Sequence, residues 1–186
     1  MGVTTKPKQT PTDKREIYYR DRVRQQGQRY PQFHWPSVQV LLNLAYTYNV
    51  TAAHLARALG KHGLSPSSFN LLMILSRNGG EGCPLYEIGE LLLVSRANVT
   101  GLVDSLERKG LVERVTDKRD RRVRVARITK AGETLLESLL PEHYLDLRKI
   151  CSRLNTAEKA SLGDLLTKLR NSVQFSPDNK GPGKKP

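Results

Sequence analysis

The chain has 186 residues and a formal net charge of +13, with 31 Lys and Arg against 18 Asp and Glu, and 38% of its residues are hydrophobic. That size and apolar content suit one globular domain, or a small domain with an added assembly element. No apolar run approaches the roughly 18–20 residues that cross a bilayer, and no apolar segment of the signal-peptide kind opens the sequence. The two cysteines, far apart, form neither a disulfide framework nor a zinc pattern. We therefore expect a cytoplasmic protein that does not contact membranes.

The excess positive charge is concentrated in three segments. Residues 114–130 hold eight basic and two acidic side chains, residues 1–36 hold eight and three, and residues 176–186 hold three and one. These differences account for the whole +13, so the rest of the chain is balanced. A neutral body with basic segments is typical of a protein that contacts a polyanion such as nucleic acid.

The N-terminal part is predicted to be helical. Residues 1–12 lack periodicity and are expected to be disordered, and a short polar helix over 13–26 needs a partner surface to be stable. A long helix follows over about 36–59, because apolar residues recur there at three- and four-residue spacing until Gly60. A serine and a proline then open a further helix over 65–77.

The middle of the chain is predicted to pass from helix to strand. A short helix over 84–92 is followed by a helix over 95–109 that carries one apolar stripe. Two β-branched runs, 111–115 and 123–129, then flank a loop that is almost entirely charged, residues 116–122. This pattern predicts a β-hairpin with a basic tip.

Two more helices are predicted after the hairpin. The first begins at Thr129, with Pro141 as a kink, and the second begins at Asn155 or Thr156. A winged helix closes its core with about three helices and a hairpin. These two helices and the long helix over 36–59 carry apolar stripes that such a core does not need, so we expect them to pair with a second copy of the chain.

The expected fold class is therefore mainly α with a small β-hairpin wing: a winged helix-turn-helix joined to dimerisation helices. The expected divisions begin with a basic, partly disordered N-terminal extension over 1–35 and a dimerisation helix over 36–64. The DNA-binding domain follows over 65–130, then the C-terminal dimerisation helices over 131–174 and a disordered basic tail over 175–186.

A helix followed by a basic hairpin is how winged helix-turn-helix proteins meet double-stranded DNA, with the helix in the major groove and the hairpin along the backbone or minor groove. The candidate contacts lie on the helix face opposite the apolar stripe and on the hairpin: Ser95, Arg96, Asn98, Thr100, Arg119, Arg121, Arg122 and Arg124. Arg96 can donate bidentately to guanine, and Arg122 suits a narrow minor groove. Asp120 is expected to stiffen the hairpin by pairing with a neighbouring arginine.

A long motif resembles the MarR family (multiple-antibiotic-resistance regulators). It consists of CPLYEIGELLLVSRANVTGLVDSLERKGLVER over 83–114, DKRDRR over 117–122 and ITKAG over 128–132, and the likeness covers about residues 36–174. The resemblance implies a homodimer, joined through the first and the last two helices, that binds a pseudo-palindromic operator. It also implies a regulator, most often a repressor, that a small ligand or an oxidant releases from DNA. Gly101 departs from the pattern, because many members carry a basic residue there, and the N-terminal 35 residues are longer than in a minimal member.

The sequence identifies residues that could sense a small-molecule or oxidant signal less clearly than it identifies the DNA contacts. Aromatic and polar side chains that are candidates to line a pocket for a small aromatic effector are Trp35, Tyr46, His62 and Asn70, although most of them suit a dimer core equally well. Cys83 and Cys151 are candidate oxidant sensors, but a free cysteine is more often a buried small hydrophobe.

No catalytic, cofactor or metal site is expected. The four histidines do not repeat at metal-ligand spacing. The sequence has no glycine-rich phosphate loop, nucleophile elbow or pair of catalytic carboxylates, so we do not expect an enzyme. The alternative to a sequence-specific regulator is a sequence-tolerant architectural or RNA-binding protein, which the basic tails favour.

Overall fold

The computed structural model describes residues 14, 18–78, 80–116 and 123–174. For Tyr19, Arg20, Arg96 and Gln174 this description covers the backbone only. The chain divides into two compact units, Met1–Pro66 and Ser67–Pro186.

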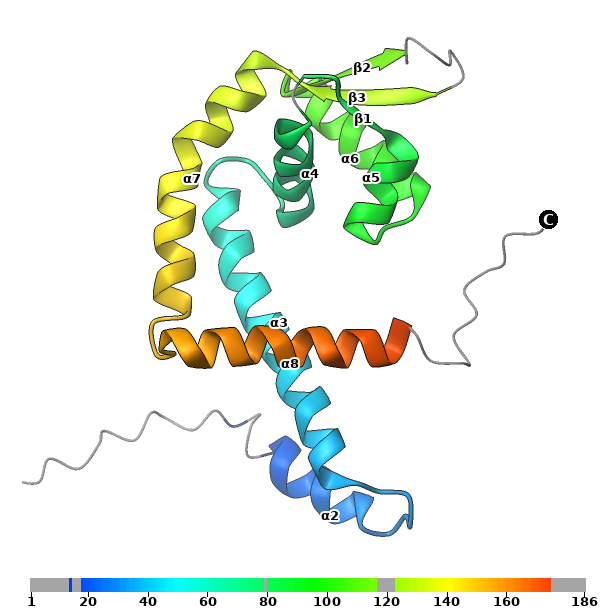
Figure 1. The fold of residues 1–186 in the computed structure, drawn as a ribbon, viewed down its shortest axis with the longest axis vertical. Helices are drawn as coiled ribbons and strands as arrows, with labels where there is room; N and C mark the ends of the chain where they lie inside the picture. The colour runs from blue at the N-terminus through cyan, green and yellow to red at the C-terminus, as the bar shows by residue number, and fades with distance from the viewer. Residues whose placement is uncertain (1–13, 15–17, 79, 117–122, 175–186) are drawn as a thin grey trace, which may run out of the picture. The chain divides into compact units, whose positions relative to one another are not determined.

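The first unit contains a short π-helix, η1 (Tyr19–Val23), then α2 (Arg24–Gly27) and the long α3 (Trp35–Gly60), as Figure 1 shows. Helix α3 begins one residue before the predicted start, after His34 in an extended conformation. Pro36 lies in the first turn of α3, where its missing N–H has no partner to lose. The end of α2 at Gly27 and of α3 at Gly60 agrees with the sequence pattern.

The second unit contains the helix-turn-helix and a small sheet (Figure 1). Its helices and strands up to the end of the wing are α4 (Pro66–Arg77), β1 (Cys83–Pro84), α5 (Leu85–Leu92), α6 (Arg96–Arg108), β2 (Val112–Thr116) and β3 (Arg124–Ile128). Their apolar faces form a core in which the largest fully buried side chains are Leu71, Leu72, Leu75, Cys83, Ile88, Val99, Val103, Leu106 and Val112. These fully buried side chains all belong to the second unit and include the predicted stripe of α6.

The sheet has three strands where the sequence predicted a two-stranded hairpin. The strand order is β1-β3-β2, and all pairs are antiparallel. In β1, Cys83 lies opposite Ala126 and Pro84 opposite Val125. Strand β1 has only two residues, one of them a proline without an N–H, whereas the sequence pattern predicts that Pro84 begins the following helix. So short a strand leaves no periodic signal, and only the pairing with β3 defines it.

The two ends of the hairpin are tied together at its base. Thr129 caps the next helix: its Oγ1 accepts a hydrogen bond from the Gly132 N–H at 3.2 Å and donates one to the Gly110 carbonyl at 2.7 Å. A Cβ on Gly132 would lie 2.3 Å from the carbonyl oxygen of Leu111. Only glycine permits this approach, so Gly132 sets how closely the next helix lies against the start of the hairpin.

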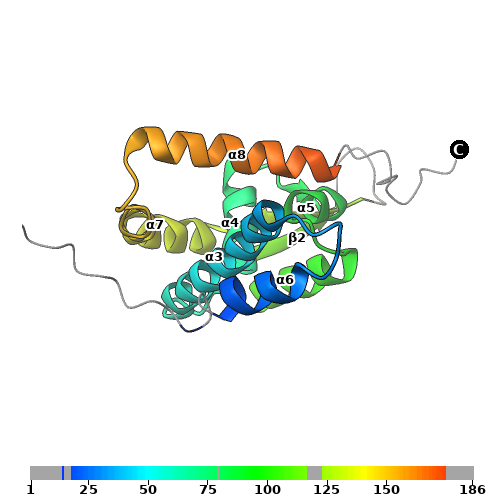
Figure 2. The same ribbon diagram turned by 90° about the horizontal axis from the view of Figure 1, so that it is seen from below.

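Two long helices complete the second unit. Helix α7 (Lys130–Ile150) continues through Pro141 without a break. A short turn leads from it into α8 (Thr156–Gln174), as Figure 2 shows. Asn155 and Glu158 cap α8 reciprocally, with Asn155 Oδ1 accepting from the Glu158 N–H at 2.9 Å and Glu158 Oε2 accepting from the Asn155 N–H at 2.8 Å. The local sequence therefore fixes where α8 begins.

Candidate nucleic-acid interface

Helix α6 is held by its cap and by its apolar stripe. Ser95 caps the helix, and its Oγ accepts a hydrogen bond from the Asn98 N–H at 3.3 Å. Val99, Val103 and Leu106 are buried on the opposite side. Burial of this stripe fixes the rotation of α6, and so decides which residues face the solvent.

The solvent-facing side of α6 carries the predicted residues that the structure describes there. Asn98, Thr100, Gly101 and Asp104 are exposed, as is Ser95 at the cap. A Cβ on Gly101 would meet no atom within 4 Å, so this position has room for a side chain. Arg96 is the first residue of α6, and its side chain lies outside the described part.

The wing consists of β2 and β3, paired from Val112 opposite Ile128 to Thr116 opposite Arg124. Each strand differs from its predicted bounds by one residue at both ends: β2 is shifted by one residue, and β3 is one residue shorter at each end. Arg124 is exposed at the outer end of β3. The other hairpin candidates, Arg119, Asp120, Arg121 and Arg122, lie outside the described residues.

Ion pairs neutralise three of the four described basic residues of 114–130, two in the wing and one at the start of α7. Arg127 Nη1 lies 3.7 Å from Glu113 Oε1, and Lys130 Nζ lies 3.2 Å from Glu133 Oε2. Arg114 pairs with two acids of α6. Among the described basic residues of 114–130, Arg124 alone has no ion-pair partner. Within the described residues, the uncompensated charge of this segment therefore lies on Arg124, at the outer end of β3.

Arg114 is the functional candidate that sequence reasoning missed. Its guanidinium donates through Nη1 to Glu107 Oε2 and through Nη2 to Asp104 Oδ1, and Nη2 also donates to the Thr100 carbonyl at 3.3 Å. The backbone N–H of Arg114 donates to Glu107 Oε1 at 3.1 Å. Burial acts to lower the pKa of Arg114, but the hydrogen bonds and charges of Asp104 and Glu107 outweigh it and raise the pKa above its ordinary value. We call Arg114, Thr100, Asp104 and Glu107 the Arg114 cluster.

The cluster changes the interpretation of Asp104. The sequence placed Asp104 on the face that points toward a DNA groove, and it is exposed there, but its carboxylate is bound to Arg114. The sequence carried a signal for this. Acids three residues apart lie on one face of a helix, and an arginine follows on the next strand.

The two cysteines differ in environment. Cys83 is fully buried. Burial, and then the nearby charge of Glu87, raise its pKa to about 11, against a smaller lowering by a hydrogen bond with Asn78. Cys151 is exposed at the end of α7. A thiol kept protonated and covered is a poor oxidant sensor, so the case for Cys83 is weakened.

The residues predicted to line an effector pocket do not lie close together within the first unit of one chain. Trp35 and Tyr46 lie on the same helix, α3, about 16 Å apart at 1.5 Å per residue. His62 follows the far end of that helix and is exposed. Asn70 is exposed on α4 of the second unit. No small-molecule pocket in one copy of the first unit can include Trp35, Tyr46 and His62 together.

A hollow of about 340 Å³ does occur in the first unit, between α2 and the start of α3. Its lining combines aromatic, aliphatic and cationic side chains: Val23, Gln26, Gly27, Arg29, Tyr30, Phe33 and Val38. Next to it, the Arg24 guanidinium lies 5.6 Å from the centre of the Trp35 ring, a cation–π contact.

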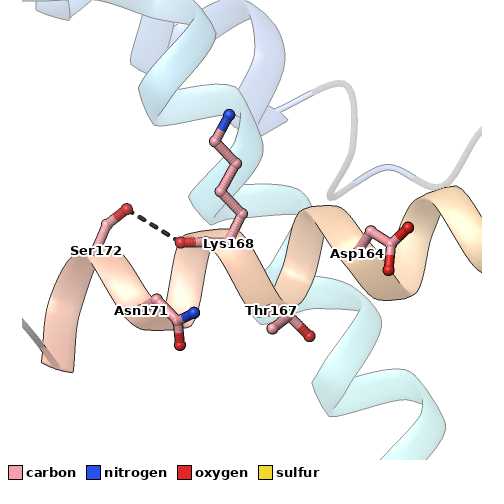
Figure 3. Close-up of a pocket in the computed structure, with 5 residues that line it drawn as sticks. All are labelled: Asp164, Thr167, Lys168, Asn171 and Ser172. Carbon is pink, nitrogen blue, oxygen red and sulfur yellow. Dashed lines mark hydrogen bonds between the residues drawn. The ribbon is translucent and has the colours of Figure 1, made fainter.

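A larger hollow, of about 560 Å³, lies along α8 and is lined by Asp164, Thr167, Lys168, Asn171 and Ser172. Figure 3 shows that these side chains all come from one helix, and that Ser172 Oγ donates to the Lys168 carbonyl, at 3.1 Å. It is an open polar helix face. Within the described ranges there is no group of three or more His, Cys, Asp or Glu side chains that could hold a metal ion. Nor is any described helix long and apolar enough to cross a membrane.

Comparisons with known proteins agree on one family. The model of the MarR family matches residues 62–123. The HTH-type transcriptional regulator MhqR of Bacillus subtilis is 32% identical over 140 residues, which cover 75% of this chain and 95% of that protein. The transcriptional repressor MprA of Escherichia coli is 30% identical over 113 residues, covering 61% of this chain and 64% of that protein. Among solved structures, Sco3205, a MarR family regulator from Streptomyces coelicolor in complex with DNA, has a TM-score of 0.72 and 23% identity, over 79% of this chain and 94% of that one.

Proposed function

The chain belongs to the MarR family of transcription regulators, and from this premise we propose that it is a homodimeric repressor that binds a pseudo-palindromic operator. The observation that carries the proposal is the orientation of α6. Its apolar stripe is buried, and its exposed face presents Ser95, Asn98 and Thr100 beside the wing. A helix so oriented can enter the major groove while the wing follows the neighbouring backbone.

Exposed apolar residues support the homodimer. In the first unit, Val40, Leu41, Leu44, Tyr48 and Val50 of α3 are exposed. In the second unit, the exposed apolar residues of α7 and α8 include Tyr144, Leu145, Leu162, Leu165 and Val173. So much apolar surface on long helices is typical of an assembly interface, and an identical copy carries the matching helices.

Repression and release extend the proposal. The E. coli relative is named as a repressor, which favours repression by this chain. For release, we propose a small aromatic acid as the effector rather than oxidation of Cys83. The hollow in the first unit offers Tyr30 and Phe33 for an aromatic ring and Arg29 for a carboxylate.

Selection from a random-sequence duplex library tests the proposal. The wild-type protein should enrich a pseudo-palindrome with half-sites about one helical turn apart, and should bind it at least about a thousandfold more tightly than a scrambled duplex at fixed salt. Arg96→Ala should weaken binding of the enriched duplex more than of the scrambled one, since a base-edge arginine contributes about 1–3 kcal/mol of discrimination. Equal losses on both would make Arg96 a phosphate contact.

The same selection addresses the alternative of a sequence-tolerant architectural or RNA-binding protein, which the two basic tails favour. Such a protein would enrich no sequence and would bind enriched and scrambled duplexes alike at fixed salt. That result would overturn the proposed regulator.

A further inference from the structure

Strand β2 lies at an edge of the sheet, and one of its outward-facing N–H groups donates a hydrogen bond to a carboxylate of helix α6. The sheet order is β1-β3-β2, so no strand among the described residues pairs with the outer side of β2. On that side the Arg114 N–H donates to Glu107 Oε1 at 3.1 Å. A carboxylate of α6 thus occupies the position that a neighbouring strand would take.

The side chain of Arg114 makes three further contacts with α6. Its fork reaches the Thr100 carbonyl and the carboxylates of Asp104 and Glu107, which lie about one turn apart along one side of the helix. With the backbone contact, one wing residue therefore binds α6 over two turns. Several contacts spread along a helix restrain rotation as well as distance, which a single ion pair does not.

The charges in the cluster are opposite to what simple attraction to DNA would favour. Asp104 and Glu107 are exposed acids on the helix that we assign to the major groove. They repel phosphate, and by pairing with the Arg114 guanidinium they neutralise a positive charge that would otherwise attract phosphate. Their contribution to DNA binding is therefore geometric.

Resting on the proposed function, we propose that Arg114 is a positioning residue: it holds the wing at a fixed angle to α6, so that both elements fit the same operator half-site. It does not contact phosphate. Arg124, exposed and outside any described ion pair, is the phosphate-binding residue of the described wing.

The test compares four variants on the duplex that wild type enriches and on its scrambled counterpart. Arg114→Gln and the pair Asp104→Ala with Glu107→Ala each break the cluster. Arg114→Lys keeps the charge but loses the planar fork. The matched control, Glu90→Ala with Glu81→Ala, removes two exposed negative charges without changing a residue of the Arg114 cluster or the ion-pair partner of a wing arginine.

All three cluster variants should lose about tenfold or more in the ratio of enriched to scrambled affinity, and the control should keep its ratio. The opposite result is equally sharp. If removing Asp104 and Glu107 tightens binding to both duplexes by the same factor, and Arg114→Lys binds like wild type, Arg114 is a phosphate contact and the positioning role is wrong.

A measurement without DNA separates this inference from the proposed function. In the Asp104→Ala, Glu107→Ala variant, hydrogen exchange at the Arg114 amide should become faster, while exchange at the buried core amides of Val103 and Leu106 should not change. A wild type that enriches no sequence overturns the proposed function. A selective wild type whose selectivity survives every cluster variant overturns the positioning role alone.

Discussion

Helices α6 and α8 have similar sequence patterns and opposite surroundings. Both carry apolar residues at three- and four-residue spacing. In α6, Val99, Val103 and Leu106 are 1%, 0% and 0% exposed, whereas in α8 Leu162, Leu165 and Leu166 are 45%, 64% and 37% exposed. An amphipathic pattern therefore predicts a helix and its apolar face, but it does not say whether that face packs within the chain or against another copy.

The difference has a thermodynamic consequence. Buried apolar surface contributes about 25 cal/mol per Å² when it leaves water, so the stripe of α6 already stabilises its own unit. The stripe of α8 contributes only when a partner covers it. Stability that comes from α6 should be independent of protein concentration, and stability that comes from α8 should rise with it.

The largest effect is expected from charges placed on the α8 stripe. Leu166→Asp with Leu169→Asp would bury unpaired carboxylates in the proposed interface and should raise the dimer dissociation constant by more than about a thousandfold. Analytical ultracentrifugation over a concentration series measures this change. A matched pair of changes on the polar face, Thr167→Asp with Asn171→Asp, should leave the dimer intact. If the Leu166, Leu169 variant stays a dimer at low micromolar concentration, α8 is not the interface.

Truncating a core side chain should lower the free energy of unfolding by nearly as much as the α8 charges lower the free energy of dimerisation. Leu106→Ala removes a fully buried side chain and should lower the free energy of unfolding by about 2–5 kcal/mol at every protein concentration. Leu165→Ala, on the exposed stripe, should cost an amount that depends on how much dimer is present. Urea unfolding at two concentrations distinguishes them, and a concentration-independent loss in both variants would remove the contrast between the helices.

The two thiols should react at very different rates. With a pKa of about 11, against an ordinary value of 9.0, Cys83 has about one hundredth of an ordinary thiolate population at pH 8, and burial restricts access further. Iodoacetamide should therefore label Cys151 first by at least about a hundredfold in rate, as peptide mass spectrometry would record. In denaturant both thiols should react alike. Fast labelling of Cys83 in the native protein would return it to the list of oxidant sensors.

The raised pKa of Cys83 also predicts a pH dependence of stability. Below about pH 9 the thiol is protonated in both folded and unfolded chains, and its contribution to stability is complete. Between about pH 9 and 11 the unfolded chain loses this proton while the folded chain keeps it, so the free energy of unfolding should fall. Cys83→Ser should reduce this part of the decline in urea titrations, and an unchanged slope would mean that other groups cause it.

The smallest effect concerns Gly101. Because its Cβ position is open, Gly101→Ala should stabilise α6 by up to about 1 kcal/mol. Gly110→Ala is the matched control: that site is also open, but its φ of 69° lies in the left-handed region, so alanine there should destabilise by about 1 kcal/mol. Thermal melts compare the two. A loss of stability in Gly101→Ala would mean that α6 packs more tightly there than the structure has it.

Much of the fold was predictable because it depends on local signals. The N-caps Ser95, Thr129 and Asn155 stand where the sequence placed the helix starts, and Gly27 and Gly60 where it placed helix ends. The buried stripe of α6 also followed from its spacing alone. These features depend on residues within a few positions of each other, so a single sequence contains the information.

The candidate site was less predictable. The DNA-contact roles of Ser95, Arg96, Asn98, Thr100 and Arg124 remain predictions, as do those assigned to residues 119–122. What reasoning from the sequence missed was the Arg114 cluster, which joins α6 to β2 across a turn. It also grouped Trp35, Tyr46 and His62 in one pocket because of their chemistry, although a straight α3 keeps the first two about 16 Å apart and His62 follows its far end.

The sequence by itself determined where the helices and the hairpin lie, which face of α6 is apolar and where positive charge accumulates, since all of these depend on residue type and short-range spacing. Only the tertiary structure decided which charges are compensated, that Cys83 and Pro84 form a third strand, and that Gly132 must approach the Leu111 carbonyl. Each of these depends on a contact between separate segments of the chain, which exists only after the backbone has brought them together, and the apolar periodicity of a single helix or strand does not determine it.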